Sequence, residues 1–290
     1  MAPKSLEALP TTVEEARTRI RALIEPAAPE TAARETDWIL EWVTGLDRAR
    51  LLVAGNSPLD SDQANRAMGA AMRRATREPL QYILGRADFF GRTFEVGPGA
   101  LIPRPETEHL VEEALQGLPG NARVLDAGAG SGCIACTISL ERPDVSVFAL
   151  DISPVALDWS RRNTQKLDAR VTHIQGDMLN PEQVLPRGLD LIASNPPYVP
   201  REDAPDLQPE LAHEPETALF VDGDREAYVR ALVRWAGRLL VPGGRLLVET
   251  HAPDAARLLE LLRSTHLGAQ RIVRDLSGRP RVLCATRQPF

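Results

Sequence analysis

From about residue 104 onward, short apolar runs typical of strands alternate with longer segments of helical periodicity. The strand-like runs are RVLDA, VSVFALD, VTHIQ, LDLIAS and GRLLVET. This alternation predicts a mostly parallel sheet with helices on both faces, because parallel strands need a crossover connection that is usually helical. The final segment, RIVRDLSGRPRVLCATR, predicts two strands joined by a turn, which places an antiparallel strand in the same sheet.

The chain in front of this α/β region divides into two parts. Residues 1–78 show helical spacing of apolar residues and no strand pattern, so they predict a small helical bundle. Residues 79–103 carry glycines between short aromatic and β-branched runs, which is typical of a hairpin. We therefore expect a helical domain over 1–78, a β-hairpin linker over 79–103 and an α/β domain over 104–290.

Composition restricts the classes of function. The 290 residues are 43% hydrophobic and carry a formal net charge of -6 at pH 7. An acidic chain is a poor match for a nucleic-acid binder, which needs cations to replace phosphate counterions. No apolar run approaches the roughly 20 residues of a membrane-spanning helix, and the N-terminal segment lacks the apolar core of a signal peptide. We expect a cytoplasmic protein with no membrane partner and no direct nucleic-acid substrate.

Cys133 and Cys136 have the C-x-x-C spacing of some zinc sites. Such a site needs two further ligands, and only the distant Cys284 and scattered histidines remain. We therefore interpret the pair as small buried residues on a helix and expect no metal site.

A glycine loop follows the first strand of the α/β region. VLDAGAGSG places Gly128, Gly130 and Gly132 there, where the backbone can approach a ligand and the next helix offers free N–H groups. The dinucleotide fingerprint G-x-G-x-x-G would need glycine at position 133, so Cys133 disfavours a pyrophosphate ligand. A purely structural turn is the alternative interpretation.

Acidic residues surround this loop. Asp151 ends the second strand, where a carboxylate can accept both ribose hydroxyls of a nucleoside; its alternative role is at the next helix start, although Ser153 is the better N-cap. Asp126, inside the first strand, would need backbone N–H groups or a ligand ammonium as partners. Asp177 ends the third strand, and Met178 would pack on the base or in the core. A nucleoside ligand without a pyrophosphate points to S-adenosylmethionine.

The fourth strand ends abruptly in ASNPPYVP, since neither Pro196 nor Pro197 has an N–H for a ladder. Asn195 and the carbonyl of Pro196 then offer two acceptors, which suit the two in-plane hydrogens of a conjugated NH2 group. Tyr198 could stack on such a planar group. We expect this site to aim an NH2 nitrogen at a methyl sulfonium, which is catalysis by positioning. A proline turn without chemistry is the alternative.

The tetrapeptide NPPY at this place is the signature of methyltransferases that act on planar amino nitrogens, among them adenine and glutamine methylators. The segments REPLQYILG, FFGRTFEV, LIPRPETE and EPETAL narrow the likeness. With them the chain resembles the HemK/PrmC family of release-factor glutamine methyltransferases over nearly its whole length, least in the first 75 residues.

The resemblance implies a Rossmann-like class I S-adenosylmethionine-dependent methyltransferase domain and an N-terminal domain that docks the substrate. The implied reaction methylates the side-chain amide nitrogen of glutamine in the Gly-Gly-Gln motif of class I peptide chain release factors, giving N5-methylglutamine. Implied cofactor contacts are Gly128, Ala129, Gly130, Ser131, Gly132, Asp151 and Met178, where the family often has an aromatic residue at the last position; to these we add Asp126, Asp177 and Asn195. The implied substrate clamp is Asn195, Pro196, Pro197 and Tyr198, and Arg104 and Glu106 are expected in the cleft, with helix entry as their alternative role.

Two other classes share part of this pattern. An adenine-N6 methyltransferase acting on DNA or RNA would use the same clamp on a flipped base, but it should carry a basic face. A non-catalytic binding module would keep only the cofactor pocket, and the intact Asn195 and glycine loop argue against it.

Overall fold

The computed structural model describes residues 8–180 and 182–289, and these fall into two compact units. The first unit contains the residues up to Gly85 together with the segment Pro209–His213, and the second contains Arg86–Gln208 and the residues from Glu214 onward. We expected the helical domain to end at residue 78, and no pattern in the sequence pointed to the inclusion of Pro209–His213.

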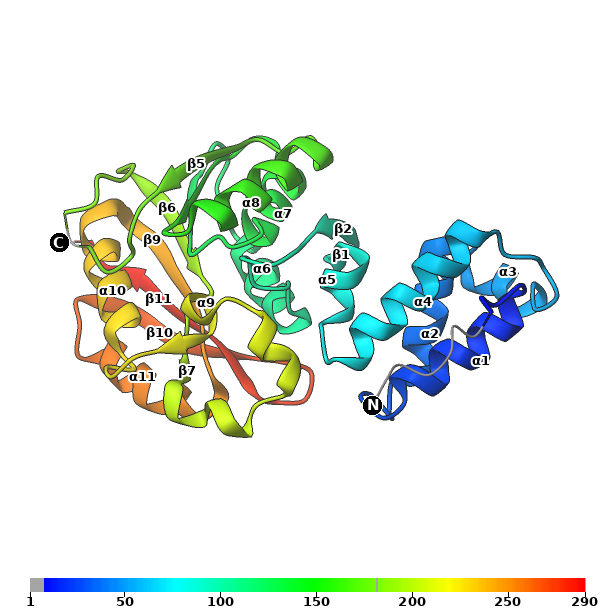
Figure 1. Ribbon diagram of the computed structural model, residues 1–290. Coiled ribbons are helices and arrows are strands. Elements are labelled where there is room, and N and C mark those ends of the chain that lie inside the picture. The colour runs from blue at the N-terminus through cyan, green and yellow to red at the C-terminus, as the bar shows by residue number, and fades with distance from the viewer. Residues whose placement is uncertain (1–7, 181, 290) are drawn as a thin grey trace. The chain divides into compact units, whose positions relative to one another are not determined.

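The first unit is helical in its described part (Figure 1). Its helices are α1 (Val13–Ile24), α2 (Ala32–Thr44), α3 (Arg48–Val53), α4 (Ser61–Ala75) and α5 (Leu80–Leu84). α1 begins after Thr12, whose hydroxyl accepts a hydrogen bond from the N–H of Glu15, and α4 begins with a capping box of Asp60 and Gln63. The apolar stripes of these helices share one core, as their spacing predicts.

The second unit begins with the antiparallel hairpin of β1 (Arg86–Phe89) and β2 (Arg92–Glu95). Both residues of its turn, Phe90 and Gly91, are left-handed with φ of 50° and 69°. That geometry matches the twist of the two strands. The N–H of Phe90 donates to a carboxylate oxygen of Glu108 at 2.7 Å, which fastens the hairpin to the start of α6 (Glu108–Leu115).

A seven-stranded sheet with the order β10-β11-β9-β6-β3-β4-β5 organises the described part of this unit (Figure 1). Its strands are β3 (Arg123–Ala127), β4 (Ser146–Asp151), β5 (Val171–Gln175), β6 (Leu189–Ser194), β9 (Leu240–Glu249), β10 (Leu267–Arg274) and β11 (Pro280–Arg287). Neighbours from β9 to β5 pair in parallel, whereas β11 is antiparallel to both β9 and β10. The expected fold class is confirmed.

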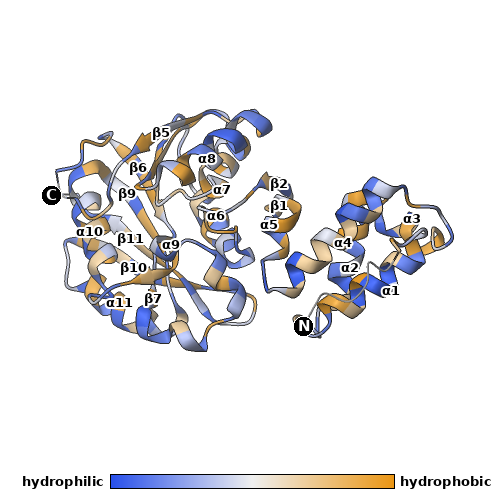
Figure 2. Cartoon of the chain, in the orientation of Figure 1, coloured by the Kyte–Doolittle hydropathy of each residue, from blue (hydrophilic) through white to orange (hydrophobic). Residues whose placement is uncertain are grey.

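Helices cover both faces of this sheet. α6 and α7 (Cys133–Glu141) pack on one face, and α10 (Ala227–Leu239) and α11 (Ala255–Arg263) pack on the other. Successive residues of β3 serve opposite cores, since Val124 packs under α6 and α7 and Leu125 under α10 and α11. α8 (Pro154–Leu167) packs against α7 and β5. Figure 2 accordingly shows strands such as β6 and β9 as mainly hydrophobic and the helices as mixed.

The carboxyl ends of β3, β4 and β6 share one edge of the sheet. β6 stops at Ser194 because Pro196 and Pro197 cannot donate to a ladder. The chain then forms a short parallel pair, β7 (Val199–Pro200) with β8 (Phe220–Val221), and the one-turn helix α9 (Glu216–Leu219). No helix within 8–180 or 182–289 is long and apolar enough to cross a membrane.

Candidate active site

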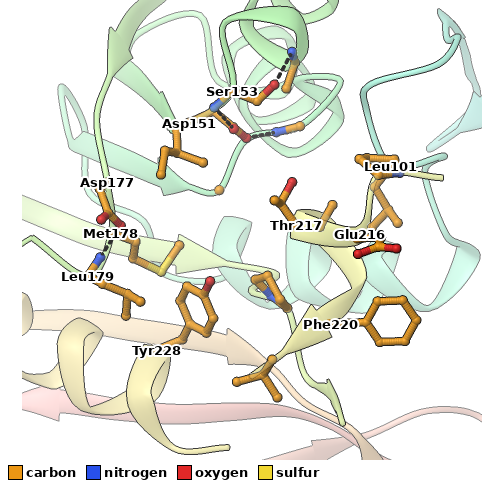
Figure 3. A pocket seen from close by; sticks show the side chains of 18 of the residues that line it. Leu101, Asp151, Ser153, Asp177, Met178, Leu179, Glu216, Thr217, Phe220 and Tyr228 are labelled. Atoms are coloured by element: carbon orange, nitrogen blue, oxygen red, sulfur yellow. Dashed lines mark hydrogen bonds between the residues drawn. The ribbon is translucent and has the colours of Figure 1, made fainter. Parts of the chain in front are cut away.

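A cavity of about 320 Å³ lies at this carboxyl edge (Figure 3). Its wall comes from the glycine loop, the ends of β4 and β5, the residues after β6, the segment around α9 and β8, and the start of α10. Of the expected contacts, Gly128, Gly130, Asp151, Asp177, Met178, Asn195 and Pro197 line it. Asp126, Ala129, Ser131, Gly132, Pro196, Tyr198, Arg104 and Glu106 do not.

The glycines of the loop have separate functions. Gly128 has a φ of +82°, and a Cβ added to it would lie 3.2 Å from Cε of Met178 and 3.8 Å from the carbonyl oxygen of Asn195. Gly132 instead faces α8, because its added Cβ would lie 2.3 Å from Oγ of Ser160. The absence of a side chain at Gly128 therefore leaves space in the cavity, whereas at Gly132 it permits close packing between the loop and α8.

Asp151 is held firmly in the wall. Its Oδ2 accepts a hydrogen bond from the N–H of Gly130 at 2.8 Å, and its Oδ1 accepts one from the N–H of Ser153 at 2.9 Å (Figure 3). Ser153, and not Asp151, caps α8 by accepting from the N–H of Ala156. Burial raises the pKa of Asp151 above its usual value. Each carboxylate oxygen keeps a lone pair, so the group can still accept hydroxyl donors from a ligand.

The opposite part of the wall is largely apolar. Met178 is 6% exposed, and it lies beside Leu179 and Tyr228 at the cavity in Figure 3. Oδ1 of Asp177 accepts from the N–H of Leu179 at 2.8 Å, which orders the backbone after β5. A flexible thioether and an aromatic ring form a surface suited to a flat base.

Asp126 is fully buried and lies outside the cavity wall. Its Oδ2 accepts from the N–H of Ala135 in α7 at 3.0 Å, as expected for a buried acid, but its Oδ1 has no hydrogen-bond partner among the described residues. The pKa of Asp126 is raised to about 7, chiefly by burial and also by the nearby charge of Asp151, while the hydrogen bond from Ala135 acts to lower it.

The residues after β6 divide between those that line the cavity and those that lie beside it. Asn195 lines the cavity, and its Nδ2 donates to Oγ1 of Thr107 at 3.2 Å. The ring of Tyr198 is parallel to that of His251, with centroids 6.1 Å apart and planes 2° apart. Burial raises the pKa of the Tyr198 phenol, which keeps it neutral at physiological pH. The stacking partner of Tyr198 in this structure is thus a histidine.

Arg104 and Glu106 form ion pairs. A guanidinium nitrogen of Arg104 lies 2.5 Å from Oε1 of the buried Glu214, whose Oε2 accepts from the N–H of Ile102 at 2.9 Å. Glu106 lies 3.6 Å from Arg281. These contacts fasten the segment in front of α6 to distant parts of the second unit.

Residues 215–222 form part of the wall that the sequence analysis did not assign. Glu216, Thr217 and Phe220 line the cavity and are labelled in Figure 3. Arg201 pairs with Glu216 at 2.9 Å and with Asp222 at 2.5 Å, which ties this segment to β7. The segment EPETAL within this stretch carries only a family likeness in the sequence, because no periodicity indicates that it lines a cavity.

All three cysteines are buried free thiols, with Cys133 and Cys136 on α7. This burial matches the interpretation of their spacing as core packing. Among the residues that the structure describes, no group of three or more histidine, cysteine or acidic side chains is placed to hold a metal ion.

The residues present fit S-adenosylmethionine. The cavity has a thin glycine wall, a fixed carboxylate on the neighbouring strand and an apolar side for a base, all at the carboxyl edge of a mostly parallel sheet. The same sheet contains the antiparallel strand β11, as expected for the last strand of this fold class. The fold and the site define a class I S-adenosylmethionine-dependent methyltransferase.

Comparisons with known proteins narrow this class. Residues 15–85 match the model of the PrmC N-terminal domain, and residues 107–225 match that of the methyltransferase small domain. The release factor glutamine methyltransferase of Neisseria gonorrhoeae is 41% identical over 248 residues, which cover 86% of this chain and 91% of the relative. That of Geobacter sulfurreducens is 40% identical over 264 residues, covering 91% and 92%.

A solved methyltransferase from Pyrococcus furiosus shares the fold, with a TM-score of 0.51 at 17% identity, over 79% of this chain and all of that one. The relatives of known name decide the family, because their identity extends over most of both chains. The chain belongs to the release factor glutamine methyltransferase family.

Proposed function

We propose that this chain transfers the methyl group of S-adenosylmethionine to the side-chain amide nitrogen of the glutamine in the Gly-Gly-Gln motif of class I peptide chain release factors. The placement of Asn195 is the observation that supports this most. It lines the cavity, and its Nδ2 is engaged by Thr107, so its Oδ1 can accept a hydrogen from a substrate NH2 group.

The substrate nitrogen is a weak nucleophile, because the lone pair of a carboxamide is delocalised into its carbonyl. Oδ1 of Asn195 and the carbonyl oxygen of Pro196 are proposed to accept its two hydrogens. Hydrogen bonds in this sense favour positive charge on nitrogen, which develops as the new C–N bond forms and the S–C bond breaks. The nitrogen then gives one proton to solvent. Asn195 acts by orientation and electrostatics and takes no proton itself.

When bound, S-adenosylmethionine supplies a methyl group activated by a sulfonium. Asp151 is proposed to accept the ribose hydroxyls, since its carboxylate is already oriented by two backbone N–H groups. Met178 and Tyr228 are proposed to pack against the adenine, and the backbone at Gly128 is proposed to lie against the ligand. The helical first unit is proposed to dock the release factor, which its match to the PrmC N-terminal domain supports.

The test is incubation of the full chain with a purified class I release factor and methyl-labelled cofactor, followed by mass mapping of the modified peptide. We expect one methyl group on the glutamine of Gly-Gly-Gln. Duplex DNA containing adenine serves as the competing acceptor, and label in DNA rather than in the release factor would favour the adenine alternative.

Asn195→Ala is the matched variant for this experiment. Removal of one preorganised acceptor should lower kcat about 100- to 1,000-fold, as loss of a single oxyanion-hole donor does elsewhere. The dissociation constant for the cofactor should stay nearly the same. A parallel loss of cofactor binding, with activity following occupancy, would remove Asn195 from the clamp.

A further inference from the structure

Asn195 contacts one buried polar side chain, and a second lies beside the first; no sequence pattern singled out either for this purpose. Thr107, at the start of α6, is 2% exposed, and Glu249, the last residue of β9, is 3% exposed. Oγ1 of Thr107 accepts from Nδ2 of Asn195 at 3.2 Å, and the Thr107 hydroxyl lies close enough to the carboxyl group of Glu249 to lower its pKa. Three segments far apart in the sequence thus bring these polar side chains together.

We propose that Thr107 and Glu249 are positioning residues that fix which way the Asn195 carboxamide is turned, so that its oxygen faces the substrate amide. This inference rests on the proposed function. The two ends of a carboxamide are nearly equal in size, so packing alone hardly distinguishes the two orientations. With the NH2 group turned toward the substrate, donors would face donors and the clamp would fail.

The orientation follows from counting hydrogens. A hydroxyl has one hydrogen to donate, and an ionised carboxylate can only accept. Ionised Glu249 therefore takes the hydrogen of Thr107, and Thr107 can offer Asn195 only a lone pair. Asn195 must then present its NH2 group to Thr107, which leaves Oδ1 for the substrate.

Two observations argue against an ordinary structural role for these residues. Thr107 occupies the N-cap position of α6, yet its side chain makes no capping hydrogen bond. Its hydroxyl oxygen accepts from Asn195 instead and lies beside the carboxyl group of Glu249. Oε2 of Glu249 is buried and has no hydrogen-bond partner among the described residues, so a stabilising role alone does not account for a carboxyl group there.

The charge on Glu249 controls the arrangement. The pKa of Glu249 is raised to about 7, chiefly by burial and also by the charge of Glu106, while the Thr107 hydroxyl, Arg281 and Arg104 act to lower it. Tyr198, whose own pKa is raised by burial and further by Glu249, stays neutral. Protonated Glu249 can donate to Thr107, which frees the threonine hydrogen to point at Asn195. The preference for the productive orientation is then lost.

The kinetic test uses Thr107→Val, Thr107→Ser and Glu249→Gln, with Thr137→Val as the matched control. Thr137 is a buried threonine on α7 whose hydroxyl lacks a described partner, and it lies outside the site. We expect Thr107→Val to lower kcat about 10- to 100-fold while the cofactor dissociation constant changes less than about twofold. Thr107→Ser should recover most of the activity, and Thr137→Val should match the wild type.

The pH dependence separates positioning from simple destabilisation. Wild-type kcat should rise with pH through an apparent pKa near 7, and Glu249→Gln should remove that step, because its amide does not ionise. A wild-type pH profile in Glu249→Gln, or wild-type kcat in Thr107→Val, would overturn the proposal.

A measurement without turnover keeps this inference separate from the proposed function. In uniformly nitrogen-15-labelled protein, the side-chain NH2 signals of Asn195 are those lost in Asn195→Ala. They should shift with pH through the same transition in the wild type and not in Thr107→Val. If no release factor is methylated, the proposed substrate is wrong, but this titration still tests the orientation of the Asn195 carboxamide. Wild-type NH2 signals that do not change with pH would contradict the proposed role of Thr107 and Glu249.

Discussion

Replacement of Gly128 by alanine tests whether the glycine loop shapes the cavity or only makes a turn. The left-handed backbone at Gly128 costs an alanine about 1–2 kcal/mol, and the smaller entropy of the unfolded alanine chain offsets about 0.4–1 kcal/mol of this. The free energy of unfolding should therefore fall by about 1 kcal/mol. That amount corresponds to a Tm shift of about 2–4 °C for a domain of this size.

The effect on cofactor binding should be larger. The new Cβ would stand 3.2 Å from Cε of Met178 and 3.8 Å from the carbonyl oxygen of Asn195, so it narrows the cavity between two of its walls. Crowding of a packed site by one methyl group costs about 1–3 kcal/mol. At about 1.4 kcal/mol per tenfold, the dissociation constant for S-adenosylmethionine should rise roughly 5- to 150-fold.

Gly188→Ala provides the matched control. Gly188 has a φ of +69°, its added Cβ would meet nothing within 4 Å, and it does not line the cavity. It should lose a similar free energy of unfolding in urea and bind the cofactor as the wild type does in isothermal titration calorimetry. Equal cofactor affinity in the Gly128→Ala and Gly188→Ala variants would refute the reasoning, because backbone strain would then be the whole effect.

Asp151→Asn should raise the cofactor dissociation constant at least about tenfold, because a hydrogen bond to a charged group contributes about 1.5–3 kcal/mol. The new NH2 group would also face a backbone N–H that now donates to the carboxylate. Unchanged affinity by calorimetry would remove Asp151 from the ribose site. The free energy of unfolding should fall as pH rises from the ordinary aspartate range to about 7, because Asp126 stays protonated in the folded chain while it ionises in the unfolded one. Its share of the slope is at most about 1.4 kcal/mol per pH unit, and urea denaturation should show a flatter profile for Asp126→Asn. Identical slopes in the two proteins would mean that Asp126 is charged when folded.

The sheet could be predicted because its signals are local. Most parallel strands are short apolar runs that end at or just before a glycine, an acid or an Asn-Pro step, and most helices between them have clear periodicity. The exception is α7, whose residues are buried on all sides. β9 shows the limit of this approach, since it begins at Leu240 and not at the GRLLVET run. Pro242 and the left-handed Gly243 look like a loop in the sequence, but the structure accommodates them in the strand with a shift of register against β6.

The candidate site could be predicted only for residues that lie at or just after the carboxyl ends of strands. Gly128, Asp151 and Asn195 directly follow or end strands, and Met178 comes three residues after β5, so the carboxyl-edge rule brings them together. The contact of Asn195 with Thr107 joins residues 88 positions apart, and the parallel rings of Tyr198 and His251 are 53 positions apart. Such pairs follow from the tertiary fold, and no spacing along the chain indicates them.

Two buried acids at the carboxyl edge link stability to function. Asp126 stands one residue before the end of β3 and Glu249 at the end of β9, each with one buried oxygen that lacks a described partner and with a pKa raised to about 7. Burial of such groups opposes folding, and an apolar residue of similar volume would be more favourable at either position. Thr107, which accepts from Asn195, lies beside Glu249, and the charge of Asp151 acts on Asp126. The two acids that lower stability therefore lie beside the proposed substrate clamp and the proposed ribose acceptor. Methyl transfer requires that both of these groups be correctly oriented.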